Sequence, residues 1–157
     1  MALDFQEYIA SLGKEKYRSS IVIAEPGRGK TFFAKKAAKA LGGKYLDLLE
    51  YFLNNKELVK TIDSFGPENF FQLLERETKG EHFVVVDHMD FLLDTWRDQE
   101  FERFMRGIRQ QWNSFLERYR STVCYFLQPS SRLKNIEITD SQGNSRIHKL
   151  SSFKAFI

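Results

Sequence analysis

Short runs of apolar residues predict three buried β-strands in this chain. The predicted strands cover residues 21–24, 82–87 and 122–127, with polar residues only at their ends. Runs of this length without a polar interruption are typical of parallel strands that are covered on both faces. A mixed segment, 44–48, predicts a further short strand.

Apolar residues at three- and four-residue spacing predict helices between these strands. Gly and Pro mark the boundaries of these helices, since Gly is favoured where a helix ends and Pro is favoured where a helix begins. The first helix carries Phe5, Ile9 and Leu12, with Asp4 as its N-cap. The others are expected from about 30 to 41, from 49 to 62 with a break at 54–55, from 67 to 80, and from about 97 to 120. Strands that alternate with helices predict a three-layer α/β fold with a mostly parallel sheet.

The C-terminal part has a different pattern. Residues 136–139 and 146–150 alternate between apolar and polar, and a stretch rich in turn-forming residues separates them. This pattern predicts a β-hairpin. The hairpin is either a sheet edge or a projection whose Arg146, His148 and Lys149 contact DNA or a partner. Its second strand, or the aromatic and exposed-looking segment 153–157, supplies the fifth strand of the sheet.

Length and composition indicate one domain over residues 1–157 of a cytoplasmic protein. The net charge of +3 is too small to argue for or against nucleic acid. A single cysteine, Cys124, excludes a disulfide framework and favours a reducing compartment. The N-terminus lacks the pattern of a secretory signal, and we expect no membrane-spanning segment.

A glycine-bearing turn lies between the first strand and the second helix. Residues 24–31 read Ala-Glu-Pro-Gly-Arg-Gly-Lys-Thr, which is the P-loop (Walker A) pattern with Ala24 in place of the usual first glycine. Glycines let successive backbone N–H groups point inward and cradle a polyphosphate at a helix N-terminus. Strand, turn and helix follow in the order that the pattern needs. The residues expected to bind the nucleotide are Glu25, Pro26, Gly27, Arg28, Gly29, Lys30 and Thr31.

Two of these residues have specific roles in the expected site for ATP and Mg²⁺. Lys30 would neutralise the β- and γ-phosphates, and the Thr31 hydroxyl would ligate Mg²⁺. Arg28 lies at the tip of the turn, where it contacts phosphate or points into water. Asp87 ends a buried strand about fifty-five residues further on, and is expected as the second, Walker B, residue at the metal. We expect no other metal site.

These two motifs resemble the AAA-type, additional-strand branch of P-loop NTPases. The resemblance rests on residues 24–31 and on Phe83-Val84-Val85-Val86-Asp87. It implies the strand order 5-1-4-3-2, with the strand at 122–127 between those that carry the two motifs. The helical lid domain that follows such cores, with its sensor 2 residue, is not expected here. If the resemblance extends to an arginine finger, the candidates for it are Arg132, Arg118 and Arg120.

The resemblance also implies roles for residues beside the phosphates. The position after Asp87 is usually a glutamate that activates the attacking water, but here it is His88. An imidazole could act as a base in principle, and Asp90 could substitute if the chain turns back. The replacement more often indicates slow hydrolysis or activation by a partner. Gln128 occupies the sensor 1 position at the end of its strand.

Arginines line one side of the long predicted helix. Arg103, Arg106 and Arg109 lie largely off the apolar stripe and are interspersed with acids. The ordinary interpretation is a solvated charged face on a core-packed helix. The alternative is a face that docks nucleic acid or a neighbouring subunit.

In size and motif order the chain also resembles BrxF, the family of small P-loop proteins of type 3 BREX phage-defence systems. This resemblance implies a role beside a larger AAA-type ATPase and other defence proteins, and self-association is left open. Three functions follow as alternatives: an ATP-binding, slowly hydrolysing switch, a DNA-handling ATPase resembling helicase loaders, and a degenerate P-loop scaffold for protein binding. Intact Lys30, Thr31 and Asp87 argue against the scaffold.

Overall fold

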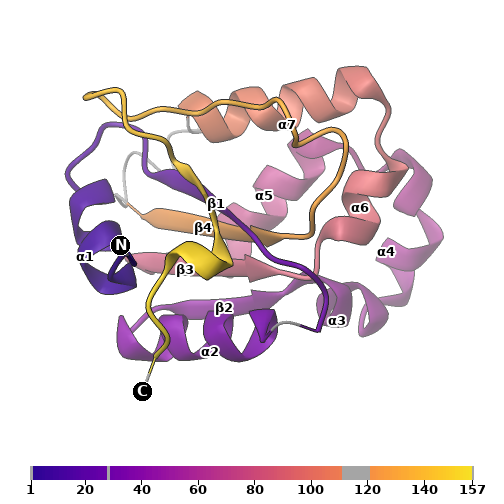
Figure 1. Ribbon diagram of the computed structural model, residues 1–157. Helices are drawn as coiled ribbons and strands as arrows, with labels where there is room; N and C mark the ends of the chain where they lie inside the picture. Colours follow the sequence, from indigo (N-terminus) through magenta and orange to yellow (C-terminus); the bar gives the residue numbers. More distant parts are fainter. Residues whose placement is uncertain (1, 28, 111–120, 157) are drawn as a thin grey trace.

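A parallel five-stranded sheet forms the centre of the computed structural model, which describes residues 2–27, 29–110 and 121–156 (Figure 1). The order is β2-β3-β4-β1-β5, and every pairing is parallel. This confirms the predicted order 5-1-4-3-2, with β4 between the strands that carry the two motifs. The strands are β1 Ser19–Ile23, β2 Lys44–Asp47, β3 Phe83–Asp87, β4 Thr122–Leu127 and β5 Ile147–Lys149.

The helices largely follow the predicted pattern. The predicted break at residues 54–55 separates α3 from α4, and α6 was not predicted. The longest predicted helix is described only as far as Gln110, and residues 111–120 lie outside the described part of the chain. The helices are α1 Phe5–Leu12, α2 Lys30–Ala40, α3 Leu48–Leu53, α4 Lys56–Lys60, α5 Pro67–Glu77, α6 Asp90–Thr95 and α7 Asp98–Gln110, with 3₁₀ turns at Ile62–Ser64 and Leu150–Ser152.

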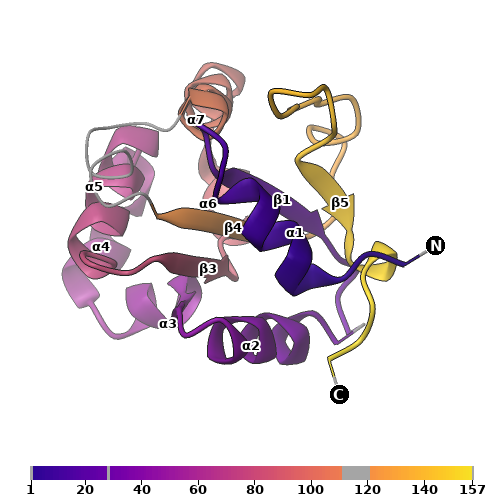
Figure 2. The same cartoon turned by 90° about the vertical axis from the view of Figure 1, so that its left-hand side faces the viewer.

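Helices cover both faces of the sheet (Figure 2), and each face carries its own apolar core. Successive side chains of a strand point to opposite faces, so β3 contributes Val84 and Val86 to the core under α5, α6 and α7. Phe83 and Val85 belong instead to the core under α1 and α2. By the same alternation, Asp87 points to the same face of the sheet as Phe83 and Val85. The carboxylate at the end of β3 therefore faces α2.

The predicted C-terminal hairpin is reduced to a turn closed by one antiparallel bridge, between Thr139 and Ser145. The segment after the turn becomes β5 and pairs in parallel with β1. Arg146 does not project, because its buried guanidinium donates to four backbone carbonyls at 3.1–3.2 Å. For this residue the projecting alternative is excluded, and the segment forms the sheet edge instead. Phe153 is also buried rather than exposed, since it packs against Phe5.

The arginine-bearing side of α7 is partly neutralised by acids. Arg103 lies 2.8 Å from Glu68 of α5, and Arg109 lies 3.3 Å from Glu102. This favours the ordinary interpretation of a solvated charged face. Within the ranges that the structure describes, every helix is too short or too polar to cross a membrane.

Candidate functional site

The turn between β1 and α2 has the backbone shape that its glycines permit. Gly27 and Gly29 have φ angles of 74° and 77°, in the left-handed region that side chains disfavour. Open space lies where a Cβ would stand at each of them. Gly29 is also the N-cap of α2, so the first N–H groups of that eleven-residue helix open onto the turn. An anion fits here, because these N–H groups and the helix dipole favour negative charge.

Other residues of the predicted loop are placed as follows. Ala24 is buried and its N–H donates to the Leu127 carbonyl, so the small residue packs against the end of β4. Glu25 and Pro26 are exposed at the turn. Arg28 lies outside the described residues.

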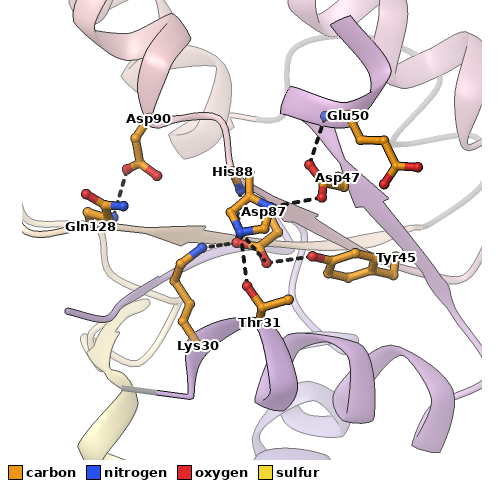
Figure 3. Close-up of polar contacts among 9 residues, drawn as sticks. All are labelled: Lys30, Thr31, Tyr45, Asp47, Glu50, Asp87, His88, Asp90 and Gln128. Atoms are coloured by element: carbon orange, nitrogen blue, oxygen red, sulfur yellow. Dashed lines mark hydrogen bonds and ion pairs between the residues drawn. The ribbon is translucent and has the colours of Figure 1, made fainter. Parts of the chain in front are cut away.

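Lys30 and Asp87 form a buried ion pair at the carboxyl end of the sheet (Figure 3). The ammonium group rises from the first turn of α2 and contacts Oδ1 of Asp87, and both side chains are almost fully enclosed. The carboxylate also accepts a 2.7 Å hydrogen bond from the Tyr45 hydroxyl and a 2.9 Å bond from the His88 N–H. Burial and this neighbouring negative charge raise the pKa of Tyr45, because both disfavour the phenolate. Asp87 is thus surrounded by donors.

His88 lies between two polar residues from other elements. Its Nε2 is 3.0 Å from the Thr31 Oγ1, and its Nδ1 is 3.0 Å from Oδ2 of Asp47 (Figure 3). The His88 backbone has a φ of 58°, an uncommon conformation for a residue with a side chain. The Thr31 hydroxyl and His88, both predicted site residues, are therefore in direct contact.

Asp47 was missed by the sequence analysis. It ends β2, and the parallel register pairs Asp47 directly with Asp87 at the end of β3. The available signal was an aspartate that closes each of two neighbouring strands. Asp47 also caps α3, since its Oδ1 accepts the Glu50 N–H at 3.1 Å.

Asp90 and Gln128 meet on the other side of Asp87. Oδ1 of Asp90, the first residue of α6, accepts the backbone N–H of Gln128 at 2.8 Å. Burial raises the pKa of the Asp90 carboxyl, and the Gln128 N–H and the Lys30 charge partly oppose this. The chain thus turns back to place Asp90 near Lys30.

The suggested arginine-finger residues are either engaged or outside the described part of the chain. Arg132 contacts the Asp98 carboxylate at 3.4 Å and donates to the Leu93 carbonyl at 3.1 Å. It is therefore held against α6 and α7 of its own chain. Arg118 and Arg120 lie outside the described residues.

A cleft of about 1390 Å³ opens beside the glycine turn, on the side of β5. Glu25 and Gly29 line it at the turn, and Ile147 and Phe156 line it from β5 and the segment that follows. Phe32, which follows Thr31 in the first turn of α2, also lines the cleft and is 63% exposed. Ligand pockets are typically apolar hollows with a few polar groups, and this volume accommodates a nucleoside.

The oxygen donors beside Lys30 suit a small hard cation. The Thr31 hydroxyl and the Asp87 carboxylate face one region at the head of α2, each linked to His88 or its backbone. Mg²⁺ prefers such oxygen ligands and usually shares them with substrate phosphates. The residues therefore fit a magnesium ion, which Thr31 and Asp87 would hold.

Comparisons with known proteins give distant similarity only. No family model matches the sequence, and no curated protein matches it. A solved structure described as "Replication initiator DnaA bound to AMPPCP and single-stranded DNA" aligns at a TM-score of 0.48 and 15% identity, over 92% of this chain and 43% of that chain. A structure described as a DNA replication initiation factor aligns at 0.47 and 15%, with the same coverage of each chain. This chain spans less than half the length of either structure.

Proposed function

We propose that this protein binds ATP together with Mg²⁺ at the turn between β1 and α2. One observation carries the proposal: Asp87, fifty-seven residues after Lys30, meets Lys30 and Thr31 around the first turn of α2. The N-terminus of this helix opens onto a turn in which both glycines have left-handed φ angles. This arrangement combines an anion cradle, a fixed positive charge and oxygen ligands for a cation.

On binding, the residues of the site would replace contacts that they now make with each other by contacts to the ligand. Lys30 would transfer its contact from Asp87 to phosphate oxygens. Thr31 and Asp87 would hold Mg²⁺, which when bound neutralises charge on the phosphates. Glu25, Pro26, Gly27, Arg28 and Gly29 would surround the phosphate chain.

The cleft beside β5 would take the nucleoside. In the sheet, β3 with Asp87 lies on one side of β1, and β5 lies on the other. A ligand with its last phosphate at Lys30 therefore extends toward β5. The exposed Phe32 ring offers a surface on which a base stacks.

Hydrolysis is expected to be slow or to depend on a partner. The residue after Asp87 is His88, whose two ring nitrogens already contact Asp47 and Thr31. Asp90 is the alternative base, and Gln128 would act as sensor beside it. A DNA-handling role has less support, because Arg103 and Arg109 pair with acids. We therefore favour a nucleotide-dependent switch over a DNA-handling ATPase.

As a finer proposal, this switch belongs to a bacterial phage-defence assembly of the BREX type, beside a larger AAA-type ATPase. Only the resemblance in size and motif order supports this step. Co-purification with a tagged defence complex, with and without ATP, tests it.

Calorimetric titration of ATP with Mg²⁺ tests the central proposal. We expect saturable one-to-one binding by the wild type and at least a hundredfold loss in the double variant Lys30→Met, Asp87→Asn. The double variant removes both charges of the buried pair, so neither is left uncompensated and the fold is kept. Lys39→Met is the matched control, since Lys39 is exposed in the last turn of the same helix.

Two results would contradict the proposal. One is a wild type that binds neither ATP nor inorganic tripolyphosphate. The other is a folded double variant, with a native circular dichroism spectrum, that binds ATP as tightly as the wild type. The first would favour the scaffold function instead.

A further inference from the structure

His88 stands where a water-activating glutamate was expected, and both of its ring nitrogens are engaged. Nδ1 is 3.0 Å from the Asp47 carboxylate, and Nε2 is 3.0 Å from the Thr31 hydroxyl. The residues come from the ends of β2 and β3 and from the first turn of α2 (Figure 3). They form one chain of contacts from Asp47 through His88 to a predicted metal ligand.

Asp47 is held rigidly at the start of this chain. Its Oδ1 accepts the Glu50 N–H and caps α3, which leaves Oδ2 for His88. A carboxylate only accepts hydrogen bonds, so the facing Nδ1 must carry a proton. In a neutral imidazole the other nitrogen is then an acceptor. Asp47 therefore makes Nε2 of His88 accept the proton of the Thr31 hydroxyl.

Oδ2 of Asp87 lies 3.7 Å from Nε2 of His88, beyond hydrogen-bond distance, so Thr31 is the nearer partner of Nε2. The Tyr45 hydroxyl competes as an acceptor for the Thr31 proton, because it also interacts with Thr31. Tyr45 gives its own proton to Oδ2 of Asp87. An imidazole nitrogen is a far stronger acceptor than a phenol oxygen. The Thr31 hydroxyl therefore donates its hydrogen bond to His88. The oxygen of Thr31 then keeps its lone pairs free for a cation.

We infer that Asp47 is a positioning residue for the magnesium site. Acting through His88, it fixes the direction in which Thr31 presents its oxygen. On this inference His88 orients a metal ligand and does not serve as a general base, which also accounts for slow hydrolysis. The inference rests on the proposed binding of ATP with Mg²⁺. Partners behind a metal ligand commonly change metal affinity 10- to 100-fold when mutated.

Asp47→Asn tests the inference with little change in shape. Asn remains a good N-cap, so Oδ1 keeps the Glu50 N–H. The atom that faces Nδ1 of His88 becomes an NH₂ donor, which favours the opposite tautomer with the proton on Nε2. His88 then donates to Thr31 and occupies a lone pair that the cation needs.

The first readout is the tautomer, from ¹⁵N NMR of the His88 ring over a pH series, read where the spectrum itself shows the neutral ring. We expect a proton on Nδ1 in the wild type and on Nε2 in Asp47→Asn. The His88 signal is assigned by its loss in His88→Asn, since the chain has three histidines.

The second readout is the gain in ATP affinity that Mg²⁺ provides, measured by calorimetry with Mg²⁺ and with EDTA. Asp47→Asn should reduce this gain about tenfold and leave ATP affinity in EDTA unchanged. Asp4→Asn is the matched control, because Asp4 caps α1 in the same way away from the site.

Either of two results would overturn the inference: a wild-type proton on Nε2, or an unchanged magnesium gain in an Asp47→Asn protein whose tautomer has switched. A wild type that fails to bind ATP in both media refutes the proposed function instead. The two failures are therefore distinguishable.

Discussion

The two ends of the proposed site differ in whether their side chains already have partners within the protein. At the end formed by β2 and β3, Lys30, Asp87, His88 and Asp47 contact one another or their neighbours. At the other end, beside β5, a cleft remains open and the Phe32 ring stands 63% exposed on its wall. One end is a closed polar network, and the other is an open cleft with an exposed aromatic ring on its wall.

This difference implies two kinds of binding energy. At the polar end a ligand must replace contacts that the protein already makes, so each new contact is offset by a lost one. At the cleft a ligand covers exposed apolar surface such as the Phe32 ring, over which the Lys36 ammonium lies 5.4 Å from the ring centroid, and the gain largely follows the area buried. We therefore expect the polar end to set which chemical group binds, and the cleft to add affinity. The following predictions test this division.

The largest effect is expected on stability at the polar end. Lys30→Met leaves the Asp87 carboxylate buried without its counter-ion, with only the Tyr45 and His88 donors. Removing one partner of a buried pair costs about 3 kcal/mol or more. Urea unfolding should show this loss in the free energy of unfolding. On this expectation the lysine supports the fold in addition to its proposed role in binding, which its motif alone does not indicate.

A second substitution serves as the control for this loss. Adding Asp87→Asn removes the stranded charge, and most of the lost stability should return. The double-mutant cycle gives the coupling energy of the pair directly. Coupling near zero would show that the ion pair adds nothing to the closed network, and the contrast between the ends would fail.

The cleft should show the reverse behaviour, with an effect on binding and little on stability. Phe32→Ala removes an exposed ring, and base stacking on an aromatic side chain is worth about 1–3 kcal/mol. We expect ATP affinity to fall about tenfold while affinity for inorganic tripolyphosphate, which has no base, stays the same. Calorimetry with both ligands measures this.

Leu53→Ala is the matched control for loss of an exposed apolar side chain, because Leu53 is 66% exposed on α3 and does not line the cleft. If Phe32→Ala lowers the affinities for ATP and for tripolyphosphate equally, the substitution acts on phosphate binding at the glycine turn. The cleft would then not be the nucleoside subsite.

Much of the fold could be predicted from local patterns. Apolar runs at 83–86 and 123–127 are too short for helices, and Gly42 and Pro67 mark helix boundaries, so strand and helix positions followed from the sequence. The glycine turn was predictable because its conformation needs glycine at Gly27 and Gly29. These features depend on neighbours in sequence, which a pattern records.

Several features that depend on neighbours in space escaped prediction, although the resemblance to P-loop NTPases gave the strand order. Asp47 reaches His88 only because β2 and β3 pair in one register. Arg146 seemed solvated in an alternating segment, yet β5 lies beside β1 and brings its guanidinium against the carbonyls of Tyr17 and Ser19. A charged side chain that finds several buried carbonyls is determined by tertiary packing, and the local sequence pattern gives no sign of it.

The smallest effect is expected at Asp90, on the edge of the polar network. Burial raises its pKa, so the folded state binds the proton more tightly than the unfolded chain does. At neutral pH the buried charge therefore lowers stability, and this penalty disappears as the pH falls through the raised pKa toward the ordinary value. Asn is neutral at every pH and keeps an oxygen for the Gln128 N–H.

Asp90→Asn should therefore stabilise the protein by about 1 kcal/mol or less at pH 7, with no advantage below about pH 4, the usual pKa of aspartate. Urea unfolding at a series of pH values measures the difference, and Asp94→Asn on the same helix controls for the loss of an exposed charge. An advantage that persists at low pH would assign the effect to packing. If ATP turnover also falls in Asp90→Asn, the carboxylate that costs stability at pH 7 is the one that catalysis needs.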